Sequence, residues 1–464
     1  MSTPRAANPF ARRLPGRATP DDLRKMAWAP SYRAPRACDF ANLPAVELPD
    51  VSGEERELLD AILADVEADE PRLRYAGFVG SDRIRAEVLG NVTRTASLDE
   101  AFAPWSARDL VYRRGFAEGM SLAGRSFISL GSHLVRLTPL RELRLVAVAP
   151  FLNELAACPH LGRIESLDLR GNHLEAAGVR ELAASPHLHR LTHLNLATNS
   201  LAADGVRELL HAPWRGRLRG LNVADNNLDP AAVDRLLEEP AFADMVELDL
   251  SHNRLGPSLA EKLPRTAIVC LLKKLSLAGN GIGPGGASAF FAADRLNTLT
   301  DLDLSFNGIS PAGAFALADA ESFRAARVLD LGFNDLEDTG AEALASAGNL
   351  FHLRELNLRA NRIGPRGAKA LGESANLAAV AKLDLAANHL GDAGAVALLT
   401  GDGLEGLREL DLSNNGITAA GVRRLIACGG LRGLELLSLA HNPIGRNAAG
   451  LIRAGGDFTG TLLL

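Results

Sequence analysis

Two short stretches of the sequence carry residue types and spacings that could do chemistry. His187, His189 and His193 would suit a metal ion, because imidazole nitrogens are common ligands of zinc and copper. Residues 279–286, Gly-Asn-Gly-Ile-Gly-Pro-Gly-Gly, are as rich in glycine as a loop that cradles phosphate, but they lack the Lys-Ser or Lys-Thr ending of such a loop. Whether either stretch forms a site depends on the elements that position it.

An internal repeat sets those elements. An asparagine recurs at intervals of 27 residues, with leucine five residues before it in all eleven copies and leucine three residues before it in ten. Only leucine or isoleucine stands two residues after it. Eleven copies in phase predict one structural unit repeated along the chain. The asparagines are Asn172, Asn199, Asn226, Asn253, Asn280, Asn307, Asn334, Asn361, Asn388, Asn415 and Asn442.

Each unit is predicted to hold one short strand and one helix. The Leu-x-Leu step alternates as a strand does, and the segment from about six to thirteen residues after the asparagine is rich in Ala, Leu, Glu and Arg, which favour helix. Such a unit cannot bury its apolar faces alone, so the units must stack into a solenoid. Strands pair about 4.8 Å apart, whereas helices need about 8 to 10 Å, so the stack must curve with the sheet inside.

The repeated asparagine is predicted to be a structural ladder. Its amide both donates and accepts, so we expect it to bond backbone groups of its own and the neighbouring unit, and its loss should cost about 1 to 3 kcal/mol. A glycine six residues later, in eight copies, is expected to begin the helix where neighbouring backbones approach closely.

The same register removes both chemical candidates. His187 occupies the position that His160 holds one unit earlier, whereas His193 lies on the strand, so the histidines should not converge. Residues 279–286 are the turn of one repeat. We therefore predict no metal site, no cofactor and no catalytic residues in the repeats.

The repeat motif resembles a known family. Leu302-Asp303-Leu304-Ser305-Phe306-Asn307-Gly308-Ile309, followed by a helical half, is similar to leucine-rich repeats of the ribonuclease-inhibitor-like class. The resemblance implies an α/β fold: a right-handed solenoid, or horseshoe, with a concave parallel β-sheet and convex helices, which binds other macromolecules on its concave face. We assign residues 151–464 to this domain, as eleven 27-residue repeats.

The preceding sequence has a different character. Residues 1–50 contain eight prolines and a cluster of arginines, which predict a disordered basic arm. Residues 51–150 are predicted to form a small, mostly helical capping domain, and Leu58–Asp65 with Asp69–Ala76 resemble a bacterial companion domain found ahead of leucine-rich repeats. Residues 115–122 and 140–145 read as two irregular strands that cap the first edge of the sheet.

Charge marks the concave face as a candidate docking surface. Its outward columns, with their flanking residues, hold eleven acidic and four basic side chains, which favours a protein partner with a basic patch and argues against nucleic acid there. The alternative is a solvated sheet whose Asp and Asn are a repeat feature. The candidate partner-binding acids are Asp249, Asp303, Asp330, Asp384, Asp411, Glu355 and Glu409.

Two aromatic residues add a candidate anchor. Phe306 and Phe333 each stand one residue before the repeat asparagine in adjacent units, so they should lie side by side on the rim of the face. The alternative is that both rings fold back onto the loop.

These observations predict a non-enzymatic protein-interaction scaffold. The alternatives are a regulator of a GTPase or an inhibitor of a hydrolase, which the family resemblance alone suggests, and an enzyme with a site in residues 51–150. Leu464 falls at the position of the first strand leucine of a twelfth unit. Such a half strand can cover the eleventh unit only in part, so the C-terminal edge is expected to allow weak self-association.

Compartment follows from cysteines and hydropathy. Four separated cysteines with no Cys-x-x-Cys pair fit free, buried thiols in a reducing compartment. No apolar run reaches 18 residues, so neither a membrane span nor membrane binding is predicted, and we expect a cytoplasmic protein.

Overall fold

The computed structural model describes residues 108–113, 116–445, 448–455 and 458–464. The predicted basic arm and residues 51–107 of the predicted companion domain lie outside the described residues. The chain divides into two compact units: the first runs to Leu196 and includes Ala212–Arg217, and the second holds Ala197–His211 and Leu218–Leu464.

The first unit begins with the strands expected to precede the regular repeats. β2 (Phe116–Ala123) pairs with β1 (Arg108–Arg113) in antiparallel fashion and with β3 (Glu142–Val146) in parallel. The predicted strands around 115–122 and 140–145 are thus present. β3 also pairs with β4, so these strands belong to the same sheet as the first regular repeat. The other elements are α7 (Gly124–Leu137), α8 (Leu152–Ala156), β4 (Ser166–Asp168), α9 (Glu175–Ala183) and β5 (His193–Asn195).

The second unit is a regular alternation of strand and helix. From β6 to β14 each strand pairs in parallel with the next at a register of 27 residues, as in Asp303 opposite Asp330. Its strands are β6 (Gly220–Asn222), β7 (Glu247–Asp249), β8 (Lys274–Ser276), β9 (Asp301–Asp303), β10 (Val328–Asp330), β11 (Glu355–Asn357), β12 (Lys382–Asp384), β13 (Glu409–Asp411), β14 (Leu436–Ser438) and β15 (Thr461–Leu463). Its helices are α10 (Ala202–His211), α11 (Pro230–Glu238), α12 (Pro257–Lys262), α13 (Gly283–Phe291), α14 (Ser310–Ala318), α15 (Glu337–Ser346), α16 (Pro365–Gly372), α17 (Gly391–Thr400), α18 (Ala419–Ala427) and α19 (Ala448–Ala454).

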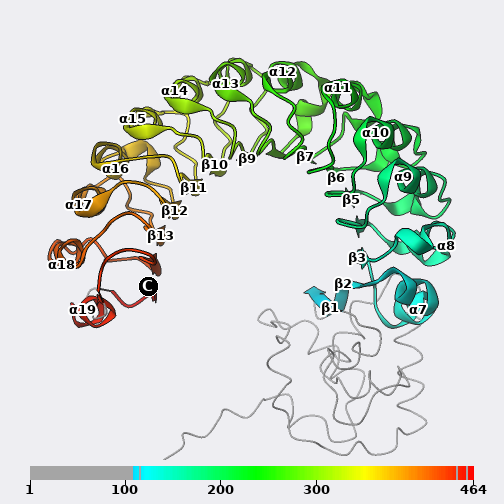
Figure 1. Ribbon diagram of the computed structural model, residues 1–464, viewed down its shortest axis with the longest axis horizontal. Coiled ribbons are helices and arrows are strands. Elements are labelled where there is room, and N and C mark those ends of the chain that lie inside the picture. The colour runs from blue at the N-terminus through cyan, green and yellow to red at the C-terminus, as the bar shows by residue number, and fades with distance from the viewer. Residues whose placement is uncertain (1–107, 114–115, 446–447, 456–457) are drawn as a thin grey trace, which may run out of the picture. The chain divides into compact units, whose positions relative to one another are not determined.

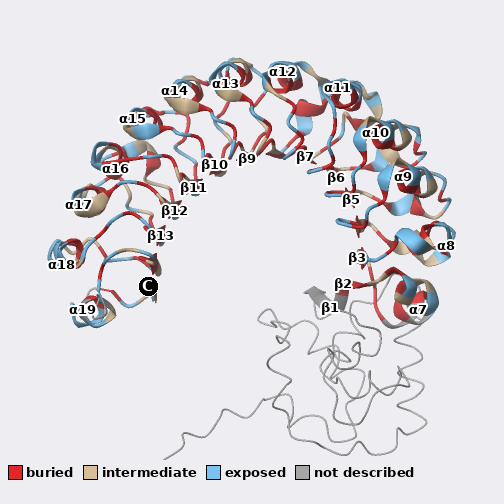
Figure 2. Ribbon diagram, in the orientation of Figure 1, coloured by how far each residue is buried: buried red, intermediate tan, exposed pale blue. Residues whose placement is uncertain are grey.

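Curvature of the second unit follows from these two layers. Its strands line the inner side of a curved stack and its helices the outer side (Figure 1). The core lies between the layers (Figure 2), where the strand leucines and the helix residues ten positions after each asparagine are buried, as Leu302, Leu304 and Leu317 are. The predicted solenoid, with a concave parallel sheet and convex helices, is confirmed.

Two details differ from the sequence predictions. Helices α9 to α18 begin three or four residues after the repeat asparagine, so the glycine six residues after it, where present, lies in the first turn. The close approach of neighbouring repeats nevertheless explains the glycine, because a Cβ on Gly286 would lie 3.0 Å from the Cα of Pro257 in the preceding repeat. At the C-terminal edge Leu462, not Leu464, occupies the strand position opposite Leu437, because the last connection is two residues shorter than a full repeat.

The cysteines also differ in part. Cys158 is buried, and burial raises the pKa of its thiol. Cys270 and Cys428 are exposed, so the expectation of buried thiols is wrong for both. Cys270 lies in a short 3-10 helix (Ala267–Leu271), and Cys428 is the residue after α18, where side chains are free to face outward.

The ladder of asparagines joins each repeat to the one before it. Asn334 Oδ1 accepts the backbone N–H of Asn307 at 3.0 Å and that of Ile309 at 3.2 Å. Its Nδ2 donates to Leu304 O at 2.9 Å and to Leu331 O at 3.0 Å. Nδ2 also lies 3.2 Å from Gly332 O. The side chain therefore serves three backbone groups of the preceding repeat and two of its own, in a residue that is completely buried.

The ladder extends through both units. In the first, Asn172 accepts from Val148 N at 3.0 Å and donates to Leu145 O at 2.8 Å. In the second, the same set recurs through Asn442, which accepts from Asn415 N at 2.9 Å and donates to Leu412 O at 2.8 Å. The hydrogen bonds predicted for the repeat asparagine are present.

Replacement of one ladder residue tests this account. Asn334→Ala should lower the free energy of unfolding by about 1 to 3 kcal/mol, because buried backbone groups lose their partner. Urea denaturation followed by circular dichroism measures it. Asn297→Ala, at an exposed loop position, is the matched control and should change stability by less than about 0.5 kcal/mol. Equal effects of the two substitutions would contradict the ladder's role.

Candidate functional site

Five of the acidic residues chosen from the sequence stand at the ends of strands of the second unit. Asp249, Asp303, Asp330, Asp384 and Asp411, which we call the strand-end aspartates, are the last residues of β7, β9, β10, β12 and β13. Asp303 pairs directly with Asp330, and Asp384 with Asp411, whereas Asn357 separates the two pairs. The structure thus brings these carboxylates together in one column on the concave side.

Each strand-end aspartate also holds its own turn. Oδ1 of Asp303 accepts the N–H of Ser305 at 3.0 Å, and Oδ1 of Asp384 accepts that of Ala386 at 2.8 Å. The Oδ1 of Asn357 does the same for Arg359 N at 2.9 Å. Asp and Asn can replace each other in this column because both offer this oxygen, and such side-chain to backbone bonds are usual for these residues in turns.

Burial and repulsion disfavour the charged form of two of these groups. Burial raises the pKa of Asp330, and the carboxylates of Asp303 and Asp384 raise it further. The pKa of Asp384 is raised by burial and by Asp411, against the opposing effect of Arg359 and Lys382. At Asp330 and Asp384, negative charge is therefore held at a cost.

Ion pairs reduce but do not cancel the charge of the face. Lys274 pairs with Glu247 at 2.8 Å and Lys382 with Glu355 at 3.8 Å. Arg359 lies 3.9 Å from Asp384. Ten of the eleven acidic residues counted from the sequence, and three of the four basic ones, lie in the second unit, so 10 − 3 leaves a net charge of −7. Glu355 and Glu409, also predicted to bind a partner, are exposed at the starts of β11 and β13.

The two phenylalanines lie side by side as predicted. The ring centroids of Phe306 and Phe333 are 4.0 Å apart and the rings are inclined by 12°, so they are stacked. They are 50% and 41% exposed, which excludes the alternative in which both fold back onto the loop. Both backbones are left-handed, with φ of 56° and 58°, a conformation that costs a bulky residue about 1 to 2 kcal/mol.

A pocket beside this stack was not foreseen. It has a volume of about 410 Å³ and is lined by Asp225, Asn227, His252, Asn253, Arg254 and Gly279. The His252 ring lies where a Cβ on Gly279 would stand, and its centroid is 6.4 Å from that of Phe306. The sequence signal is Gly279 itself, which stands between His252 and Phe306 in the position before the repeat asparagine.

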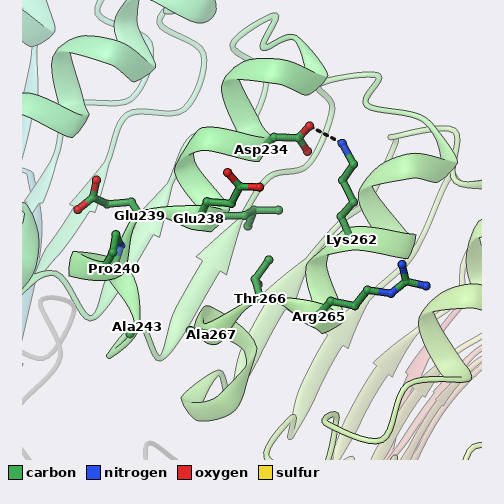
Figure 3. A pocket seen from close by; sticks show the side chains of 10 residues that line it. Asp234, Glu238, Glu239, Pro240, Ala243, Lys262, Arg265, Thr266 and Ala267 are labelled. Carbon is green, nitrogen blue, oxygen red and sulfur yellow. Dashed lines mark hydrogen bonds and ion pairs between the residues drawn. The ribbon is translucent and has the colours of Figure 1, made fainter.

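A second pocket, of about 530 Å³, lies on the helix side (Figure 3). α12 has six residues, and the chain then turns at Pro264 into short 3-10 helices, which leaves a hollow beside α11. Three carboxylates and two cations line it, and Asp234 is paired with Lys262. The mixed charge of this lining distinguishes it from the acidic concave face.

The three histidines of the candidate metal site, His187, His189 and His193, lie in the first unit. His187 precedes a 3-10 helix (Leu188–Arg190) that contains His189, and His193 begins β5. Within the described ranges, no group of three or more His, Cys, Asp or Glu side chains is arranged to hold a metal ion. No helix in the same ranges has the length and apolar character needed to cross a membrane.

Comparison with known proteins identifies the repeat. The Leucine Rich repeat family matches residues 164–183, 270–291, 295–318, 327–345, 349–372, 381–399 and 407–425. No curated protein matches the sequence. Leucine-rich repeats therefore build the chain between residues 164 and 425.

Solved structures of similar form share little sequence with this chain. The yeast Rad7 and Elc1 complex has a TM-score of 0.48 and 16% identity, covering 88% of this chain and 89% of that one. An internalin, InlF, from Listeria monocytogenes has a TM-score of 0.36 and 16% identity over 79% and 91%. The APL1 leucine-rich repeat domain has a TM-score of 0.33 and 17% identity over 68% and 76%.

The cost of the left-handed phenylalanines can be tested. The double change Phe306→Asn and Phe333→Asn should leave the free energy of unfolding within about 1 kcal/mol of the wild type, or raise it. Asparagine tolerates this backbone, as Asn414 does at φ 52° in the same column, and the loss of a ring stack worth about 0.5 to 1.5 kcal/mol offsets the relieved strain. Urea denaturation is the measurement. Phe290→Ala, in the buried core, should instead cost about 3 to 5 kcal/mol.

The raised pKa of Asp384 gives a pH dependence of stability. An acid whose pKa is higher in the folded state destabilises the fold at pH values above that pKa. This loss of stability disappears as the pH falls toward 3.8, the ordinary pKa of an aspartate. Asp384→Asn keeps an oxygen for Ala386 N, so it should be more stable than the wild type at pH 7 and lose this advantage as the pH falls. Urea denaturation midpoints of the two proteins, measured from pH 7 down toward the ordinary pKa of aspartate, test this. A stability difference that grows as the pH falls would contradict a raised pKa at Asp384.

Proposed function

We propose that this protein is a non-enzymatic interaction scaffold whose concave face binds a protein partner that carries a basic patch. Leucine-rich repeats support the general role, and we place these repeats in the ribonuclease-inhibitor-like class because the units of α13 to α18 each have a helix of eight to ten residues on the convex side. The observation that carries the proposal is the net charge of −7 on the concave face of the second unit.

The geometry of that face suits recognition of a positive surface. The strand-end aspartates repeat at the strand spacing, and the bond from each Oδ1 to its own turn holds the carboxylate at a fixed angle. A partner therefore meets preorganised charges and loses little side-chain entropy in ordering them. A curved surface of one sign also steers association, so binding should weaken as salt rises.

The charge of this face also limits the class of partner. Nucleic acid is not expected on that face, because phosphates would be repelled by it.

Neutralising the face without disturbing the turns is the direct test. The combined changes Asp303→Asn, Asp330→Asn, Asp384→Asn and Asp411→Asn remove four charges but keep an acceptor for each turn, as Asn222 and Asn357 show in the same column. Capture of partners on immobilised full-length chain, quantified by mass spectrometry, should lose its basic proteins by about tenfold or more.

A matched control separates the location of charge from its amount. Asp319→Asn, Glu321→Gln, Asp402→Asn and Glu405→Gln remove four exposed charges from the segments that follow α14 and α17. This variant should retain the partners of the wild type. Equal loss in both variants, or no loss in the first, would contradict binding at the concave face.

A further inference from the structure

The stacked phenylalanines are exposed groups that the fold itself does not require. Their column, one residue before each repeat asparagine, holds Gly279 on one side and Ala360 and Ala387 on the other, all at the same turn. The backbone there is left-handed in every one of these residues. Large rings at two positions that disfavour them indicate a use outside the fold.

The stack presents an open aromatic face. Among the described residues, Phe306 has Phe333 on one side and the tilted ring of His252 on the other. The face of Phe333 that points away from Phe306 is bordered by the repeat of Ala360, whose side chain is a single methyl group. A flat group can therefore approach Phe333 along the direction of the stack.

Two carboxylates stand near that face. Asp303 and Asp330 are three residues before the two phenylalanines. Asp335, two residues after Phe333, is already paired with Arg362 of the next repeat at 3.0 Å, so the negative charge left for a partner is that of Asp303 and Asp330. Asp330 is crowded by Asp303 and Asp384, so a positive group in this region would relieve repulsion. An aromatic face next to carboxylates selects cations, and among them a planar one gains most because it can stack while its N–H groups reach oxygen.

We propose that the stack of Phe306 and Phe333 is the anchor for an arginine side chain of the partner, whose guanidinium lies against the outer face of Phe333 and donates to the neighbouring carboxylates. The proposal rests on the proposed function, because it names the group by which the partner's basic patch engages the acidic face. It assigns the phenylalanines to recognition of a planar cation rather than of an apolar side chain.

Short peptides of defined charge test this on the full-length chain. Fluorescein-labelled hexa-arginine, hexalysine and hexacitrulline, followed by fluorescence anisotropy, separate planarity from charge, since citrulline is planar but neutral. The wild type should bind hexa-arginine most tightly, hexalysine less tightly and hexacitrulline weakest. Hexalysine binding equal to or tighter than hexa-arginine binding would overturn the proposal.

Variants of the stack complete the experiment. The pair Phe306→Leu and Phe333→Leu keeps apolar area but loses the ring faces, and it should weaken hexa-arginine by about 3- to 30-fold, as should the pair of changes to Asn. Phe315→Leu removes an equally exposed ring from α14, outside the stack, and should retain wild-type affinity. Full affinity in the Leu pair would show an apolar anchor and overturn the arginine assignment.

The outcomes also separate this inference from the proposed function. In one outcome, both basic peptides bind the wild type and lose affinity for the Asp-to-Asn variant, yet bind every variant of Phe306 and Phe333 as tightly as the wild type. That result would support binding at the acidic face and overturn the arginine anchor. If neither basic peptide binds the wild type, the proposed recognition of basic partners fails, and the anchor fails with it.

Discussion

The structure depends on one hydrogen-bonding arrangement, the carboxamide that completes the turn of the repeat before its own. Strands of three residues and short helices leave turn amides and carbonyls that no ladder of a sheet or helix can satisfy. The asparagine supplies one acceptor and two donors at a single point, as Asn307 does for Asn280, Ile282 and Leu277. With these groups satisfied, the leucines of each unit can be buried in phase.

The residue types that end the strands of the concave face also follow from the shortness of these strands. The residue that ends each strand must also fix the turn, so it is Asp or Asn in most repeats, and serine in the repeats of β8 and β14. Either amide or carboxylate meets that need, as Asn357 and Asp384 show. A charged surface is thus obtained by choosing between two residues that can both hold the turn, which leaves the charge pattern free to meet a partner.

Much of the fold was predictable because the repeat imposes its chemistry at fixed intervals. Asn334 had to be a ladder residue once ten others shared its phase, and the adjacency of Phe306 and Phe333 followed from the same register. The left-handed backbone before each asparagine was not predicted, although the glycines at Gly171 and Gly279 and the asparagine at Asn414 are residue types that favour it. What was not predictable rests on local geometry: the helix start after Asn307, the short α12, and the side chains of Cys270 and Cys428. Nor does composition reveal that Asp384 both accepts a hydrogen bond from Ala386 N in its turn and is repelled by the carboxylate of Asp411.

The ladder has a direction. Each asparagine serves the backbone of the repeat that precedes it in the chain, so a repeat is complete only when its successor is present. On a ribosome, where the N-terminal part emerges first, the newest repeat must wait for another 27 residues before its turn is closed. Folding of each repeat is therefore expected to trail its synthesis by one repeat.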